Sequence, residues 1–155
     1  MRVELDDMDK SILVELQSDG RLSDAELSQR VKASVETCAD RRKQMEDAGV
    51  ISHYGAVVDP RTIGQHGVSV TIASIARLTA EGVTMFENAV RAEPRITDCF
   101  YVAGSSDYVI RFAYSDPDDL ELFHSGVLAR LPGVVRLNSM LVLRTVVKRP
   151  SAVLF

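Results

Sequence analysis

In the second half of the chain, stretches of hydrophobic residues with strand spacing are interspersed with stretches that have helix spacing. Few folds can satisfy the order in which they occur. In four stretches apolar side chains alternate with small or polar ones, which is the period of a half-buried strand. In two other stretches they recur every three or four residues, which is the period of an amphipathic helix. The predicted elements, in chain order, are a strand at 68–73, a helix at 80–92, strands at 96–102 and 108–114, a helix from Asp116-Pro117 to Leu131, and a long strand at 134–147.

This order, β-α-β-β-α-β, predicts a four-stranded antiparallel sheet with both helices on one face, which is the ferredoxin-like arrangement. The fold class is therefore α+β. The other face is expected to be apolar, because the last strand carries hydrophobic residues in both registers. An exposed apolar face of that extent is typical of an interface, and self-association is the simplest explanation. The residues concerned are Leu137, Leu141 and Leu143 in one register and Met140, Val142 and Val146 in the other.

The first half of the chain carries three short helical patterns, each with a signal at its start. Asp7 precedes the first pattern and is expected to cap the helix. Ser23 and Glu26 have the spacing of a capping box at the start of the second. Ser34 opens the third helix, which Gly49 ends by allowing a left-handed backbone conformation. The first half is therefore expected to be helical.

An arginine interrupts the apolar stripe of the third helix. Arg42 stands where a hydrophobic residue would complete the stripe, so we expect its guanidinium to reach water or to pair with an acid, Glu46 being the nearest candidate on that helix. Residues 50–58 then change to strand-like spacing. Three short helices followed by an extended segment are typical of a winged or hinge-linked helix-turn-helix. The expected stripe consists of Val35, Cys38 and Met45.

The charge of the chain is distributed unevenly. The formal net charge is −4, and residues 1–60 carry 8 basic and 13 acidic side chains, yet residues 30–43 have a net charge of +3. If this chain binds nucleic acid, its cations must be focused locally. The sequence has no apolar run of membrane-spanning length and no export signal at its start, so we expect a cytoplasmic protein. Cys38 and Cys99 are isolated in sequence, so no zinc site is expected, and no cofactor is predicted.

Several motifs along most of the chain resemble those of the Lrp/AsnC, or feast/famine, family of prokaryotic regulators. The resemblance implies an N-terminal helix-turn-helix at 1–49, a linker or hinge strand at 50–64, and a ferredoxin-like domain at 65–155. It also implies transcription regulation, homodimers that often assemble into octamers, and binding of amino acids or related metabolites. The motifs are LDDMDKSIL at 5–13, LQSDGR at 16–21, AELSQRV at 25–31, EDAGVI at 46–51, YGA at 54–56, Asp59-Pro60, Gly64, GSSDY at 104–108 and LPGV at 131–134.

The resemblance places double-stranded DNA against the third helix. In this chain Glu36 and Thr37 are expected to read base edges, and the cations of the helix are expected to hold phosphates. The helix departs from its relatives at Glu36, Asp40, Arg42 and Gln44. The two carboxylates oppose phosphate binding by roughly 1 kcal/mol each, although a carboxylate can accept a hydrogen bond from cytosine. The candidate DNA contacts are Ser34, Val35, Glu36, Thr37, Arg41, Arg42 and Lys43.

The GSSDY turn is the candidate effector site. Its glycine allows close approach of the backbone, its hydroxyls and amides suit a carboxylate, and Asp107 suits an ammonium group, so the turn matches the main chain of an amino acid. The same residue types are also common in plain hairpin turns. The residues carried over from the resemblance are Tyr101, Gly104, Ser106, Asp107 and Tyr108, with Ser139 of a neighbouring subunit as a weaker candidate.

Two other functions remain open at this point. Haem-pathway decarboxylases resemble this two-domain arrangement, but the sequence shows no histidine in the sensing turn and no couple of nucleophile and base, so no catalytic residue is predicted. The other alternative is a metabolite-binding assembly protein whose DNA binding is weak or lost, which the altered third helix would explain. A DNA-binding regulator that responds to an amino acid is the leading prediction.

Overall fold

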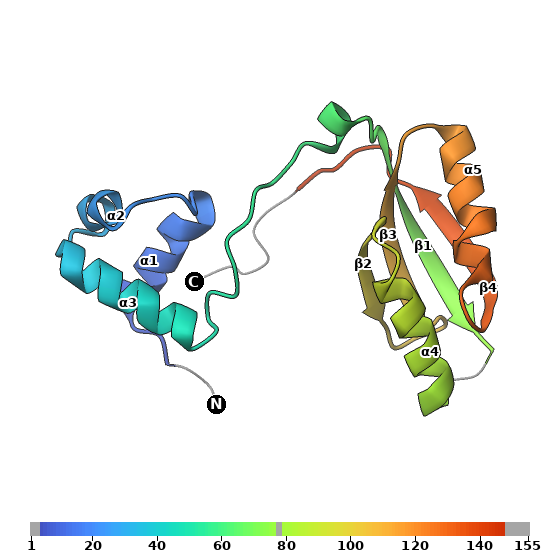
Figure 1. Cartoon of the computed structure of the whole chain (residues 1–155), viewed down its shortest axis with the longest axis horizontal. Coiled ribbons are helices and arrows are strands. Elements are labelled where there is room, and N and C mark those ends of the chain that lie inside the picture. Colours follow the sequence, from blue (N-terminus) through green and yellow to red (C-terminus); the bar gives the residue numbers. More distant parts are fainter. Residues whose placement is uncertain (1–3, 77–78, 148–155) are drawn as a thin grey trace. The chain divides into compact units, whose positions relative to one another are not determined.

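A computed structural model describes residues 4–76 and 79–147 of the chain. These residues form two compact units: an N-terminal unit that runs to Val57, and a C-terminal unit, Val58–Val146. The N-terminal unit is helical and the C-terminal unit is built on a sheet (Figure 1).

The N-terminal unit contains the three predicted helices. They are α1 (Asp7–Ser18), α2 (Asp24–Val31) and α3 (Val35–Asp47). The capping box of Ser23 and Glu26 is confirmed at the start of α2, and Ser34 caps α3. The cap predicted for α1 was wrong by one residue: Asp6 accepts from the Asp9 N–H, and the Asp9 side chain accepts from the Asp6 N–H.

One apolar core holds the three helices together. Cys38 and Met45 of α3 are buried in it as predicted. Val35 was wrongly placed on the same stripe, because it lies in the first turn of α3 and 48% of it is exposed. The buried members of the core are Ile12, Leu13, Leu16, Leu22, Leu27, Cys38 and Met45.

The segment after α3 is not the strand that its spacing predicted. Residues 52–59 have neither helix nor strand structure, and all of them are exposed. A strand needs a hydrogen-bonding neighbour, and every strand pairing in the described part of the chain lies between 67 and 141. A short 3₁₀-helix, η1 (Pro60–Ile63), follows this segment.

The C-terminal unit has the predicted β-α-β-β-α-β order. Its sheet has the strand order β2-β3-β1-β4, with antiparallel neighbours throughout. Both helices pack on one face (Figure 1), where Phe86 and Val90 of α4 and Phe123 of α5 join one core with Ile110 and Phe112 of β3. The elements are β1 (Gly67–Ile75), α4 (Ala80–Arg91), β2 (Ile96–Tyr101), β3 (Tyr108–Tyr114), α5 (Pro117–Gly126) and β4 (Val134–Leu141).

Two elements of this unit are shorter than predicted. α5 ends at Gly126, and a separate 3₁₀-helix, η2 (Leu128–Arg130), leads toward β4. β4 ends at Leu141, although strand-like spacing continues to 147. The reason is the length of its neighbour, since the β1–β4 pairing runs out at Ser69 and Leu141 near the start of β1. The Val142 N–H still donates to the Val68 carbonyl at 2.9 Å, and beyond it no strand pairing occurs within the described residues.

Candidate DNA interface and ligand-sensing site

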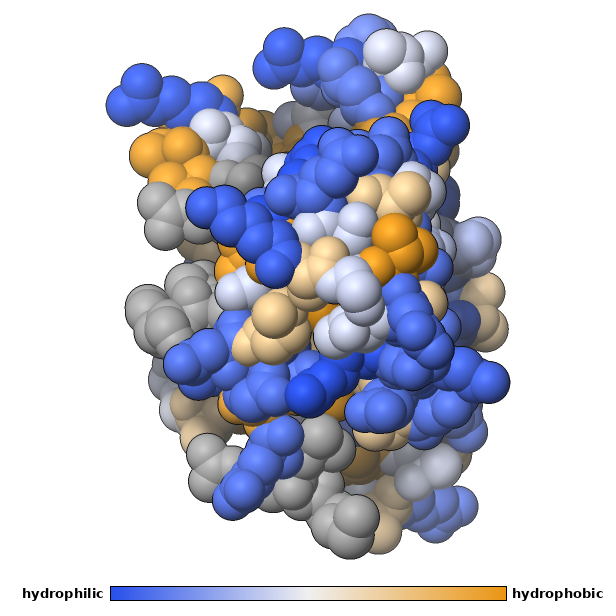
Figure 2. Space-filling model, turned by 90° about the vertical axis from the view of Figure 1, so that its left-hand side faces the viewer, coloured by the Kyte–Doolittle hydropathy of each residue, from blue (hydrophilic) through white to orange (hydrophobic). Residues whose placement is uncertain are grey.

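The start of α3 presents four of the predicted DNA contacts. Ser34 is committed to its capping role, since its Oγ accepts from the Thr37 N–H at 3.0 Å and lies 2.8 Å from Thr37 Oγ1. Val35, Glu36 and Thr37 are exposed, as is Lys43 two turns further along. The face of the molecule shown in Figure 2 is mainly hydrophilic, with hydrophobic side chains only in small groups.

Arg41 is held within the N-terminal unit rather than standing free. Its Nη1 lies 2.9 Å from Asp6 Oδ2 and 3.3 Å from Asp9 Oδ1, so it joins α3 to the start of α1. The Asp9 N–H, which donates to the Asp6 carboxylate, is the main cause that lowers the pKa of Asp6 below its usual value, and Arg41 lowers it further. Arg41 therefore forms ion pairs with both carboxylates of the capping box at the start of α1.

Arg42 does not pair with Glu46, which corrects the sequence prediction. Its Nη2 donates to the Leu22 carbonyl at 2.7 Å, and its Nη1 lies 3.3 Å from Asp24 Oδ1. Only 19% of the side chain is exposed, and its Nε has no hydrogen-bond partner in the described part of the chain. Glu46 instead accepts from the Tyr54 hydroxyl at 2.7 Å. The Arg42 guanidinium is therefore occupied between α2 and α3.

The ion pairs of these two arginines offset much of the positive charge that the sequence placed on α3. The exposed charged residues of the helix are four acids and one lysine, so the charge of its exposed residues is net negative. All residues of α3 are described, and Lys43 is the only cation among its exposed residues. Other parts of the N-terminal unit also carry exposed cations. The exposed charged residues of α3 are Glu36, Asp40, Lys43, Glu46 and Asp47.

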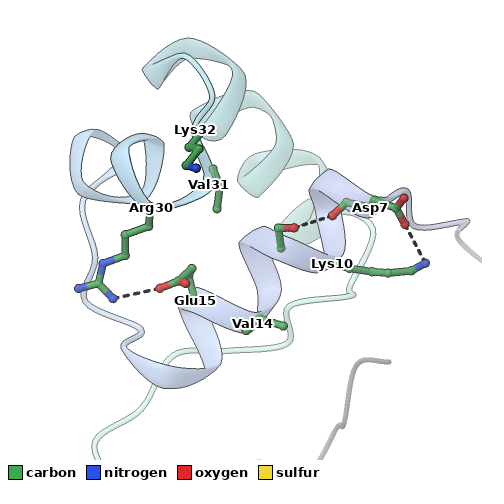
Figure 3. Close-up of a pocket in the computed structure, with 8 residues that line it drawn as sticks. Asp7, Lys10, Val14, Glu15, Arg30, Val31 and Lys32 are labelled. Carbon is green, nitrogen blue, oxygen red and sulfur yellow. Dashed lines mark hydrogen bonds and ion pairs between the residues drawn. The ribbon is translucent and has the colours of Figure 1, made fainter.

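A shallow depression beside α1 and the end of α2 supplies further cations (Figure 3). It has a volume of about 490 Å³, and three basic residues line it. Lys10 lies 3.4 Å from Asp7, and Arg30 lies 3.0 Å from Glu15. The sequence placed Arg30 and Lys32 in the basic stretch at 30–43, but it did not bring Lys10 to them, because Lys10 comes from a separate helix. The lining residues are Asp7, Lys10, Ser11, Val14, Glu15, Arg30, Val31 and Lys32.

The predicted sensing turn is tied to the neighbouring strand. Gly104 has φ +148°, a conformation that side chains rarely adopt. The Asp107 N–H donates to the Ala73 carbonyl at 3.1 Å, and Asp107 Oδ2 accepts from the Ile75 N–H at 2.8 Å. One carboxylate oxygen of Asp107 is thus engaged by the backbone, and Oδ1 forms no hydrogen bond within the described residues. Ser106 is half-buried.

Tyr101 and Tyr108 meet in a pocket of about 200 Å³ between α4 and the paired strands β2 and β3. Their ring centroids lie 5.1 Å apart. The buried Tyr108 hydroxyl lies within hydrogen-bonding distance of Glu87 Oε1 at 3.3 Å, while Glu87 Oε2 lies 2.7 Å from Arg91. Burial, followed by the charge of Glu87, raises the pKa of Tyr108 to about 12. The lining residues are Glu87, Val90, Arg91, Cys99, Tyr101 and Tyr108.

Sequence reasoning missed Glu87, Arg91 and Cys99. Glu87 and Arg91 have the spacing of an ordinary helical ion pair, and only the packing of α4 on the sheet brings them to the tyrosines. Ser139 is not brought to the turn within this chain, since its Oγ lies 2.8 Å from Thr71 Oγ1 in the middle of the β1–β4 pair. Its assignment to the site of a neighbouring subunit stays a prediction.

Comparison with known proteins agrees with this two-part architecture. Residues 5–52 match the model of a winged helix-turn-helix DNA-binding domain, and residues 69–152 match that of the Lrp/AsnC ligand binding domain. The chain belongs to the Lrp/AsnC family. It is therefore a DNA-binding transcriptional regulator of the Lrp/AsnC type and not an enzyme. The decarboxylase alternative is set aside on this ground.

Relatives of the regulator cover most of its length. A transcriptional regulator of Sinorhizobium fredii, y4sM, is 40% identical over 117 residues, which are 75% of this chain and 91% of the relative. The leucine-responsive regulatory protein of Escherichia coli is 33% identical over 131 residues, 84% of this chain and 80% of that one. The crystal structure of Neisseria meningitidis NMB0573 with L-Met superposes with a TM-score of 0.91 at 32% identity, over 96% of each chain.

These matches confirm the fold predicted from the sequence, a helix-turn-helix followed by a ferredoxin-like domain. Within the described residues, no helix is both long enough and apolar enough to span a membrane. No group of three or more potential metal ligands occurs in that part of the chain either.

Proposed function

We propose that the regulator docks the exposed start of α3 on double-stranded DNA and that its C-terminal unit senses an amino acid or a related small metabolite. In this proposal residues 1–49 bind DNA, residues 50–64 connect, and residues 65–155 sense and assemble. The observation that carries it is the pairing of a capped, exposed third helix with a separate sheet unit that has its own pocket.

The proposed DNA contacts divide into two groups. Val35, Glu36 and Thr37 are exposed at the start of α3, the part of a recognition helix that reaches base edges, and Lys43 holds a phosphate. Arg41 and Arg42 position the helix, because their guanidinium groups are engaged by α1 and α2. This division refines the sequence prediction, which assigned both arginines to phosphates.

The proposed effector site lies around the turn at 104–108 and the adjacent pocket. The free oxygen of Asp107 and the carboxylate of Glu87 suit an ammonium group, Arg91 suits a carboxylate, and Val90 offers an apolar wall. A volume of about 200 Å³ suits a small apolar amino acid. The Neisseria relative, whose crystal structure contains L-Met, supports this ligand class.

The helix-free sheet face is the proposed dimer interface. It combines half-buried valine and isoleucine side chains of β1 and β3 with the more exposed Phe100 and Met140 at its flanks. An ion pair between Arg111 and Asp98, 3.0 Å apart, lies on the same face and offers a polar contact. A homodimer is therefore proposed, and octamers of four dimers would follow the family pattern. The apolar members are Val68, Val70, Ile72, Phe100, Val109 and Met140.

Selection of bound fragments from sheared genomic DNA, with and without the standard amino acids, tests the proposal. We expect enriched fragments whose recovery changes with at least one amino acid. The variant T37A, which removes a proposed base contact, should alter which fragments are enriched. Recovery of no fragments would refute DNA docking.

The acidic surface of α3 favours one alternative function, that of an assembly protein that binds metabolites and has little affinity for DNA. That alternative predicts no enriched fragments together with an amino-acid-dependent rise in thermal stability, which follows from ligand binding to the folded state. Thermal-shift measurements on the same preparation separate the two functions.

A further inference from the structure

Lys32 stands alone in its backbone conformation. It ends α2 with φ 57° and ψ 44°. Among the described residues, it is the only residue other than glycine that has a positive φ. A side chain disfavours this left-handed conformation because its Cβ approaches the following carbonyl, whereas glycine adopts it freely. Strain of this kind persists where the surrounding structure enforces it, and it often marks a functional position.

The ammonium group of Lys32 forms no ion pair within the described residues, whereas the two other basic residues of the depression each pair with an acid. It lines the depression beside α1 together with Lys10 and Arg30 (Figure 3). Lys10 and Arg30 are each within ion-pair distance of an acid, Asp7 and Glu15. Lys32 is exposed, and no ion pair to it occurs in the part of the chain that the structure describes.

The position of Lys32 in the unit relates it to DNA. It lies two residues before Ser34, the cap of α3, in the turn that joins the two helices of the helix-turn-helix. When the start of a recognition helix enters the major groove, the preceding turn comes close to the sugar-phosphate backbone. The exposed surface of α3 is net negative and offers Lys43 as its exposed cation, so a cation just outside the helix would add to the attraction for phosphate.

We infer that Lys32 is a phosphate contact of the DNA-binding surface, presented by the left-handed turn and supported by the basic rim of the depression. This inference rests on the proposed docking of α3. A lysine ammonium acts on a phosphate as a point charge and carries no sequence information. Lys32 therefore contributes affinity to every DNA sequence alike, while residues at the start of α3 discriminate between sequences.

K32G in the full chain separates the two consequences of this residue. Because glycine relieves the backbone strain, the folding equilibrium should shift toward the native state by about fivefold. Because a phosphate contact is lost, affinity for a mixed-sequence duplex should fall several-fold, and the slope of log K against log salt should decrease in magnitude by about 0.9. A more stable protein that binds DNA less well is not expected of a purely structural residue.

Two matched variants complete the experiment. K32R keeps the charge and the strain and should keep the wild-type salt slope. R130Q removes an exposed cation from η2 of the C-terminal unit, and its slope should also be unchanged. Affinities are measured by fluorescence anisotropy over a salt series, and stability by urea unfolding.

The outcomes distinguish this inference from the function beneath it. If the wild-type chain shows no salt-dependent binding to the duplex, docking on DNA is refuted and the role of Lys32 falls with it. If the wild-type chain binds and K32G binds with the same affinity and slope, only the role of Lys32 is overturned. If K32G loses affinity but also loses stability, the strained-turn argument is overturned.

Discussion

Replacement of Arg42 tests whether an arginine on a recognition helix serves the fold or the DNA. Its stem is buried between α2 and α3, and its guanidinium meets the Leu22 carbonyl and Asp24. R42A removes two buried methylene groups, which contribute about 1.6 kcal/mol to stability. It also removes a hydrogen bond worth about 1 kcal/mol, while relieving the unpaired Nε at a comparable gain. We therefore expect R42A to destabilise the N-terminal unit by about 1.6 kcal/mol.

R42M is the matched variant, because methionine keeps an apolar stem and introduces no buried donor. It should destabilise the unit by less than about 1 kcal/mol. Hydrogen exchange of the full chain, read by mass spectrometry on segments of α2 and α3, reports this local opening. Protection should fall about 15-fold in R42A and by less than about fivefold in R42M, since each 1.4 kcal/mol is a factor of ten.

DNA binding by R42M decides the interpretation. If Arg42 positions α3, R42M should keep the salt slope of the wild-type chain for a mixed-sequence duplex. A slope reduced by about 0.9 with unchanged protection would show that Arg42 neutralises a phosphate, and the structural reasoning would then be wrong.

Three further changes have defined expectations. E36Q removes a carboxylate from the exposed start of α3, so affinity for a mixed-sequence duplex should rise about fivefold by anisotropy, and no rise would contradict the electrostatic argument. The Ser115 N–H and Arg95 lower the pKa of Asp119, so its ionised form stabilises the fold above the ordinary value of 3.8, and this stability is lost as pH falls through the lowered pKa. The urea midpoint of D119N should thus lie below the wild-type value near neutral pH and converge with it in acid. In G67A the new methyl group collides with the Tyr114 ring, so the free energy of unfolding in urea should fall by about 1–3 kcal/mol. In a Y114A background the same G67A substitution should cost less, because the ring is absent.

In the proposed docking on DNA, the acidic face of α3 affects affinity and sequence recognition in opposite directions. Under that proposal Glu36 and Asp40 would repel phosphates and reduce binding to every sequence, yet Glu36 at the start of the helix could accept a hydrogen bond from cytosine. A recognition helix of this composition gains selectivity at the expense of nonspecific affinity. Cations outside α3 must then supply the general attraction to DNA.

Local patterns in the sequence were sufficient for the three N-terminal helices and for the order and type of the helices and strands in the C-terminal unit. The periods of hydrophobic residues predicted the β-α-β-β-α-β unit, and the capping box of Ser23 and Glu26 marked the start of α2. These signals act over three to seven residues, so they are readable without knowledge of the fold. The motifs that carry the family resemblance have the same local character.

Contacts between distant segments were decided only by the tertiary structure. A helical rule pointed Arg42 to Glu46, but its partners are Leu22 and Asp24 of the preceding turn and helix. Strand-like spacing continued past Leu141 and occurred again at 50–58, yet a strand forms only where a neighbour supplies hydrogen bonds. Hydrophobic periodicity thus specifies which face of an element is buried. The packing of whole elements against one another decides where each charge and each strand end finds a partner.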